Sequence, residues 1–173
     1  MRRLVVPIVM VLTVGSVSAS AAASTLRVRV DANDSRSNLD IHKVITNLSP
    51  TTMYLRVRSW DRFNYLNMRE EWDFTLDTFG SPDVDRAVSI SPAPHGIVCI
   101  VYNLHHVPAG GEPGQRPAIR ATRPDHRSGA CHLPRSWFGH IDRAVRFRVF
   151  VFSVFTGNVS DKAPGHGGVY RWI

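Results

Sequence analysis

The chain has 173 residues and carries 21 basic against 14 acidic side chains, a formal net charge of +7. This length suits one domain with its own hydrophobic core. All basic residues except Lys43 and Lys162 are Arg, but no run of five or more basic residues occurs, so a nucleic-acid-binding tail is not expected. A basic protein could instead meet anionic polymers at a cell surface if it is exported.

The first 23 residues have the layout of a removable secretory leader. Arg2 and Arg3 precede an apolar run over residues 4–17, and small residues follow it. The run is too short to span a bilayer comfortably. We therefore predict a cleaved leader over residues 1–23, a single domain over residues 24–173 and a secreted protein without a stable membrane span. A retained membrane anchor is the alternative.

The hydrophobic pattern that follows the leader has a period of two. Apolar and Arg residues alternate strictly over residues 26–30, 55–58 and 145–149, and further strand candidates in chain order are residues 41–45, 72–77, 86–90, 97–103, 118–122 and 169–173. Connections rich in turn-forming residues separate them at residues 47–51, 79–82, 91–96, 108–117 and 156–168, and only residues 136–142 suggest a helical turn. The pattern predicts an all-β protein, an antiparallel, jelly-roll-like β-sandwich.

Both cysteines, Cys99 and Cys131, follow the leader, and an exported chain meets oxidising conditions. They allow one intramolecular disulfide, whose loop of this length would stabilise the fold by roughly 3 kcal/mol. Buried free thiols or a bridge between two molecules are the alternatives. Nothing around either residue resembles a thiol-enzyme signature.

Three strand candidates carry an Arg-x-Arg pattern, and alternation places each pair on the face opposite the core. The pairs are Arg27 and Arg29, Arg56 and Arg58, and Arg146 and Arg148, with Trp60 on the parity of the second pair and Phe150 and Phe152 on that of the third. If these strands share a sheet, its outer face is basic with interleaved aromatic rings and could bind acidic glycans. The predicted binding residues are Arg56, Arg58, Trp60, Arg146 and Arg148. The alternative is a solvated face on which Arg side chains shield the strands and a loop covers the two Phe rings.

Two acidic segments predict calcium sites, because Ca²⁺ takes six to eight oxygen ligands in flexible geometry. The first segment offers Asp31, Asn33, Asp34 and Asp40, and the second offers Asp77, Asp83 and Asp85 around a glycine. Neither segment fits the twelve-residue EF-hand loop. The alternative is that these side chains only form turns through local hydrogen bonds.

Five short motifs follow one another in a recognisable order: Asp31-x-Asn33-Asp34, Leu39-Asp40-Ile41-x-x-Val44, Leu55-x-Val57-x-Ser59-Trp60, Phe74-x-Leu76-Asp77-Thr78-x-Gly80 and Asp85-x-x-Val88. This order resembles small secreted actinobacterial-type β-sandwich proteins and, more distantly, family 9 carbohydrate-binding modules and the DOMON group. The Arg-Pro-Asp segment at 123–125 and the Asp-x-Ala-Pro segment at 161–164 add to the resemblance. It implies a jelly-roll-like sandwich, often with structural calcium and without established enzymatic activity. Phe79 and Ser81 depart from it, because family loops usually carry acids there.

Signatures of catalysis are lacking in the sequence. The adjacent His105 and His106 would point to opposite faces of a strand, and the sequence has no zinc-protease, nucleophile-elbow or phosphate-loop motif. Glu70, Glu71 and Asp73 could supply a carboxylate pair for glycoside hydrolysis, or could simply be solvated. We therefore expect a secreted non-catalytic domain that binds glycans or anionic cell-envelope polymers. A secreted hydrolase and a structural accessory protein are the alternatives.

Overall fold

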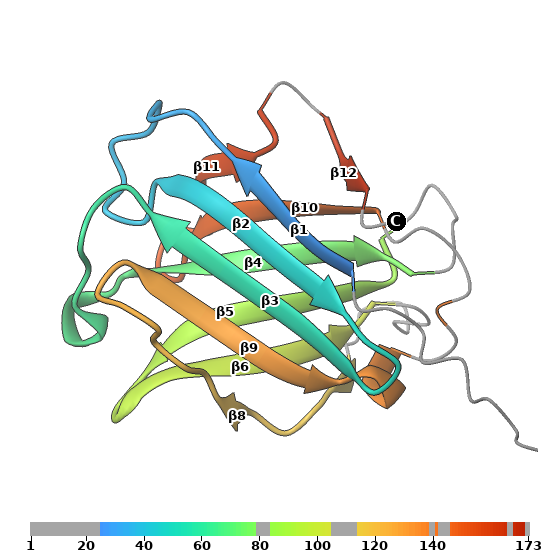
Figure 1. The fold of residues 1–173 in the computed structure, drawn as a ribbon. Coiled ribbons are helices and arrows are strands. Elements are labelled where there is room, and N and C mark those ends of the chain that lie inside the picture. Colours follow the sequence, from blue (N-terminus) through green and yellow to red (C-terminus); the bar gives the residue numbers. More distant parts are fainter. Residues whose placement is uncertain are drawn as a thin grey trace, which may run out of the picture.

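The computed structural model describes residues 25–78, 84–104, 114–138, 141, 146–165 and 168–171. Over these residues the chain forms two antiparallel sheets packed face to face, which confirms the predicted all-β sandwich (Figure 1). The helices described are two short 3-10 turns, η1 (Tyr65–Asn67) and η2 (Arg135–Phe138). No described segment is a helix of the length and apolarity needed to cross a membrane. The predicted leader lies outside the described residues.

The smaller sheet has four strands and the larger sheet has eight. In spatial order the smaller sheet consists of β1 (Thr25–Val30), β2 (Ile41–Leu48), β3 (Thr52–Ser59) and β9 (Ser128–Pro134). The larger sheet runs β11 (Val159–Ala163), β10 (Arg146–Ser153), β4 (Glu70–Asp77), β5 (Arg86–Ala93), β6 (Gly96–Asn103) and β7 (Gly114–Gln115), with β12 (Tyr170–Arg171) on β10 and β8 (Ile119–Arg120) on β6. Figure 1 shows β1, β2, β3 and β9 lying across β4, β5, β6 and β10.

The core lies between the sheets and follows the alternation of the sequence. On β3 every second residue is buried, and on β4 the buried positions include Trp72, Phe74 and Leu76, none of which is exposed to solvent. The indole nitrogen of Trp72 donates a hydrogen bond to the carbonyl oxygen of Leu39 at 3.0 Å, so its one polar atom is satisfied inside the core. Trp72 is therefore a structural residue.

One open side of the sandwich is closed by the chain itself. The segment around β8 pairs with β6, and the amide of Ala121 continues that pairing with a 2.9 Å hydrogen bond to the carbonyl of Ile97. Thr122 then forms a bridge with Ala130 of β9. This segment therefore hydrogen-bonds to both sheets and joins their edges.

The predicted disulfide lies on the same side. Cys99 of β6 and Cys131 of β9 are bonded, with their Cα atoms 5.9 Å apart. Neither residue is exposed to solvent. The pairing confirms the prediction and excludes free thiols.

The opposite side, between β1 and the strands β11 and β12, is joined by scattered polar contacts. Arg29 donates to the carbonyl of Arg171 at 3.0 Å, and its guanidinium lies 5.7 Å from the centre of the Tyr170 ring. The hydroxyl of Ser35 donates to the carbonyl of Ser160 at 2.9 Å. This side carries the acidic side chains described below.

The orientation predicted for β1 is wrong. Leu26, Val28 and Val30 face outward and are 60%, 49% and 62% exposed, whereas Arg27 and Arg29 pair with β2 positions that face the other sheet. β1 is an edge strand beside the side joined by polar contacts, where Arg29 finds the Arg171 carbonyl and the Tyr170 ring. A charged side chain is therefore accommodated on the inner face there.

The sequence pattern also missed three strands. β11 lies inside the predicted connection 156–168, because its two buried positions are the polar Asp161 and the small Ala163, which give no hydrophobic alternation. β9 was missed because Gly129 and His132 interrupt the pattern. β7 has only two residues. Conversely, the predicted turn at 91–96 is shorter, since β5 extends to Ala93 and β6 begins at Gly96.

Candidate functional site

A cleft of about 480 Å³ opens between the loop that precedes β2 and the segment that joins β3 to β4. Arg36 comes from the first segment, and Arg62 and Arg69 come from the second. All three side chains are exposed, and none forms an ion pair with an acid in the described part of the chain. The cleft therefore presents three guanidinium groups to solvent.

The floor of the cleft is fixed by the core. Phe63 is 8% exposed and packs edge-on against Trp72, with the ring centres 5.1 Å apart. Glu70 accepts hydrogen bonds from the hydroxyls of Ser37 and Ser160, the latter at 2.7 Å. Glu70 therefore ties the loop on one wall of the cleft to β4 and β11.

The arrangement suits an anion with hydroxyl groups. Guanidinium groups bind carboxylate, sulfate and phosphate through paired, charge-assisted hydrogen bonds. Asn38 and Asn64 add amide groups to the lining, and Met68 adds an apolar surface. A charged sugar needs all three kinds of contact.

A second polar site lies on the outer face of the larger sheet, where β4 and β5 form a carboxylate–serine patch. The hydroxyl of Ser89 donates to Asp73, and the hydroxyl of Ser91 donates to Glu71. On the other side of β4, the strand register places Phe150 opposite Asp73 and Phe152 opposite Glu71. The Ser89–Asp73 pair and the Ser91–Glu71 pair therefore lie next to each other on the sheet, and each has an aromatic residue of β10 beside it.

The patch is buried enough to perturb its acids. Burial raises the pKa of Asp73 to about 6 and outweighs the opposing hydrogen bond from Ser89, and the charge of Glu71 adds to the increase. Burial also raises the pKa of Tyr102, with smaller contributions from the charges of Glu71 and Asp73. A carboxyl group with such a pKa can exchange a proton near neutral pH.

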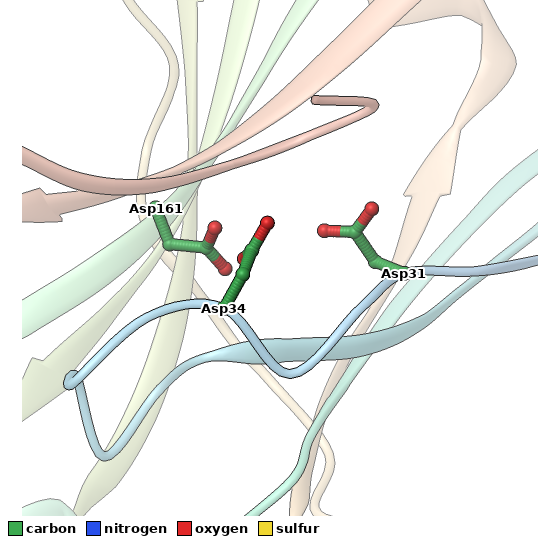
Figure 2. A group of neighbouring side chains, drawn as sticks. All are labelled: Asp31, Asp34 and Asp161. Atoms are coloured by element: carbon green, nitrogen blue, oxygen red, sulfur yellow. The ribbon is translucent and has the colours of Figure 1, made fainter. Parts of the chain in front are cut away.

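A third site is acidic and lies on the side of the sandwich between β1 and β11. Asp31 and Asp34 come from the loop after β1, and Asp161 comes from β11 (Figure 2). One carboxylate oxygen from each lies within 4.8 Å of the other two. Asp40, from the end of the same loop, interacts with Asp161.

No protein-family model, curated protein or solved structure matches this chain significantly. Function must therefore be inferred from the geometry of these three sites.

The predicted binding residues do not meet on one face. Arg56 and Arg58 lie on the outer face of the smaller sheet, whereas Arg146 and Arg148 lie on the outer face of the larger sheet. The Arg-x-Arg strands therefore do not share one sheet, and the predicted single basic face does not form. The guanidinium of Arg56 binds Asp125 at 2.8 Å, so it is partly neutralised.

Trp60 lies just after β3 and stacks on a neighbouring side chain. Its ring centre is 4.0 Å from that of His42, with the planes inclined by 28°. Burial lowers the pKa of His42, and the nearby charges of Lys43 and Arg58 act in the same direction. One face of the indole is therefore occupied within the protein.

The predicted calcium ligands fall into two groups. The structure brings Asp31, Asp34 and Asp40 together, whereas Asn33 is exposed. In the second segment Asp77 pairs with Arg146, Asp85 accepts hydrogen bonds from the amide and hydroxyl of Thr78 at 2.9 Å, and Asp83 lies outside the described residues.

The sequence reasoning missed the cleft arginines and Asp161. Arg36, Arg62 and Arg69 lie in irregular segments, where no periodicity groups them. The available signal was their proximity in sequence to Asn38 and Asn64. Asp161 was counted only as part of a family motif, because its strand was not predicted.

Proposed function

We propose that the protein is a secreted, non-catalytic domain that binds anionic polysaccharides in the arginine-lined cleft. The observation that carries the proposal is the set of three exposed guanidinium groups around a cleft of about 480 Å³, without an ion pair to a described acid. Without Arg2 and Arg3 of the predicted leader the net charge falls from +7 to +5, which would still attract polyanions. The Cys99–Cys131 disulfide is compatible with export, because such bonds persist in oxidising compartments.

The test compares dextran sulfate with neutral dextran as ligands for the purified protein. We expect binding of dextran sulfate that weakens with salt, and no binding of dextran. In the double variant Arg62→Ala/Arg69→Ala, affinity should fall at least about tenfold, because two charge-assisted contacts are lost. Isothermal titration calorimetry gives the affinities.

Non-specific attraction by a basic protein needs its own control. Arg116→Ala/Arg120→Ala removes the same charge from exposed positions outside the cleft. This variant should keep its affinity within about twofold. Equal losses in the two double variants would show that net charge, not the cleft, determines binding, and would reject the proposal.

The carboxylate–serine patch supports a second candidate, a glycoside hydrolase. Glu71 and Asp73 lie two residues apart on one strand face, so their Cα atoms are about 7 Å apart, and carboxyl groups held at a similar separation would suit an inverting enzyme. The raised pKa of Asp73 suits a general acid. Glu70 points to the opposite face and is bound by Ser37 and Ser160, so it does not join this pair.

A panel of chromogenic glycosides at pH 5–7 tests the second candidate. Turnover that disappears in Asp73→Asn and persists in Glu70→Gln would support it. No turnover of any substrate by the wild-type protein, or turnover unaffected in Asp73→Asn, would remove the patch as an active site.

A further inference from the structure

The acidic side chains between the two sheets come from distant parts of the chain. Asp31, Asp34 and Asp40 belong to the loop between β1 and β2, and Asp161 belongs to β11. Figure 2 shows the carboxylates of Asp31, Asp34 and Asp161 pointing into the same space. Like charges at this separation repel one another, and a bound cation would remove that repulsion.

Asp40 provides an independent observation that points to a bound cation. Asp40 is 2% exposed, and its Oδ1 atom is buried without a hydrogen-bond partner. Its other oxygen, Oδ2, accepts a 3.3 Å hydrogen bond from the amide of Ser35. The carboxyl group also interacts directly with that of Asp161, so it is directed into the cluster. A buried acceptor without a donor is costly, and a bound cation would satisfy it.

Asp31 shows the same feature on the other side of the cluster. Its Oδ2 atom is also buried without a partner. Asp31 also lies close enough to Asp161 and Asp34 for their charges to act on it.

No described basic side chain neutralises these acids. The ion pairs found in the described residues are Arg56 with Asp125 and Arg146 with Asp77. Asp161 accepts hydrogen bonds from two backbone amides, those of Ile41 at 2.8 Å and Lys162 at 2.7 Å. These bonds fix its position and leave it able to share its charge with a cation.

We propose that Asp31, Asp34, Asp40 and Asp161 together bind one Ca²⁺ ion, which links the loop between β1 and β2 to strand β11. The donor set consists of carboxylate oxygens on a loop and a strand, which suits a hard cation with flexible coordination. Zinc and copper favour His or Cys ligands, and the four residues offer neither. The site joins the side of the sandwich that lies opposite the disulfide.

The same loop residues also shape the arginine-lined cleft, since Arg36 and Ser37 lie between Asp34 and Asp40. The cation site is nevertheless argued from the acids alone and does not rest on polysaccharide binding. A protein that binds calcium without binding dextran sulfate would support this inference and reject the other.

Terbium luminescence provides a direct test, because Tb³⁺ occupies oxygen-rich calcium sites and is excited through nearby aromatic rings. Burial raises the pKa of Tyr170 to about 12, and the nearby charges of Asp31 and Asp161 add to the increase, so the ring lies close to the cluster. We expect saturable Tb³⁺ emission from the purified protein, displaced by Ca²⁺. Calorimetry with Ca²⁺ alone should give a stoichiometry of one.

Asp34→Asn is the informative variant, because Asp34 is exposed and its side chain forms no hydrogen bond in the described structure. It should fold like the wild type and bind Ca²⁺ at least about tenfold more weakly. Asp61→Asn changes an exposed acid outside the cluster and should leave the affinity unchanged. Saturating Ca²⁺ should raise the melting temperature of the wild type by about 5 °C or more, and that of Asp34→Asn by much less at the same concentration.

The result that would overturn the proposal is equally definite. A folded wild-type protein that binds neither Ca²⁺ nor Tb³⁺ at millimolar concentration and pH 7.5 would mean that these acids converge without holding a cation. Binding that Asp34→Asn leaves unchanged would place the ion elsewhere. Either outcome rejects the site.

Discussion

At the scale of single residues, Asp73 lies on the outer face of a sheet but has the raised pKa that is typical of a buried carboxyl group. Its carboxyl group lies between Ser89 on β5 and Phe150 on β10. Burial raises its pKa from 3.8 to about 6. The folded protein therefore holds the Asp73 proton more tightly than the unfolded chain does.

This shift has a defined sign for stability. Between about pH 4 and pH 6 the folded state binds more protons than the unfolded state, so the contribution of Asp73 to stability falls as the pH rises. Well above pH 6 the loss is complete, at about 3 kcal/mol for a change of about two pKa units in a largely buried group. Below pH 4 no loss remains.

We therefore predict that Asp73→Asn stabilises the protein at pH 7.5 and has little effect at pH 4. Asparagine keeps a carbonyl oxygen for the Ser89 hydroxyl and carries no charge to bury. Urea denaturation at both pH values measures the difference. A variant that is less stable than the wild type at pH 7.5 would show that the ionised carboxylate is stabilised in the fold.

At the scale of secondary-structure elements, strand β9 packs closely against the larger sheet at Gly129, which has no side chain. A Cβ atom at Gly129 would lie 2.9 Å from a ring carbon of Trp72 and 3.0 Å from a methyl carbon of Ile90. Ile97 would be 3.1 Å away. β9 can approach the core at this point only because residue 129 has no side chain.

Gly129→Ala should therefore destabilise the protein by about 1–3 kcal/mol, the usual cost of overpacking a core. The matched control is Gly114→Ala on β7, where the nearest atom to a new Cβ is the Cβ of Asn103 at 3.9 Å. Thermal unfolding of both variants checks the prediction. Equal melting temperatures for the two variants would show that β9 can move away from Trp72 at no cost.

The same elements show what a sequence pattern can and cannot predict. β3, β4 and β10 were predictable because each is a central strand in which apolar residues recur at every second, inward-facing position. β9 and β11 were not, since their inward positions include Gly129 and Asp161, which depend on a partner from the other sheet or a distant loop. The face of β1 that points inward could not be predicted either, because the pairing of this edge strand with β2 determines its orientation more than its own hydrophobic pattern does.

The candidate sites were likewise predictable only where their residues lie close together in the sequence. The local group of Asp31, Asp34 and Asp40 was predictable because all three acids lie in one short loop. Asp161 joins them only through the pairing of β11 with β10. The cleft arginines meet only after two loops converge, and periodicity carries no information about loops.

At the scale of the whole molecule, the two open sides of the sandwich are secured by different chemistry. One side has a covalent bond, Cys99–Cys131, and the chain segment around β8. The other has hydrogen bonds such as that from Arg29 to Arg171, together with the four acids. The fold is therefore expected to respond to reductant on one side and to divalent cations on the other.

Loss of the disulfide should have a larger effect than most single substitutions. The double variant Cys99→Ala/Cys131→Ala opens a loop with a sequence separation of 32 residues, for which chain entropy gives a loss of roughly 3–4 kcal/mol. Denaturation of the variant and of the wild type with reductant should give the same reduced stability. A variant as stable as the oxidised wild type would contradict this expectation.

The disulfide also determines what happens when a protease cuts the chain. The exposed residues 114–118 lie between Cys99 and Cys131. A single cut there would produce two polypeptides that remain covalently joined, with every described strand retained in one particle. Such a nicked molecule would migrate as intact protein until its disulfide was reduced, so a single cut would not separate the two parts of the chain.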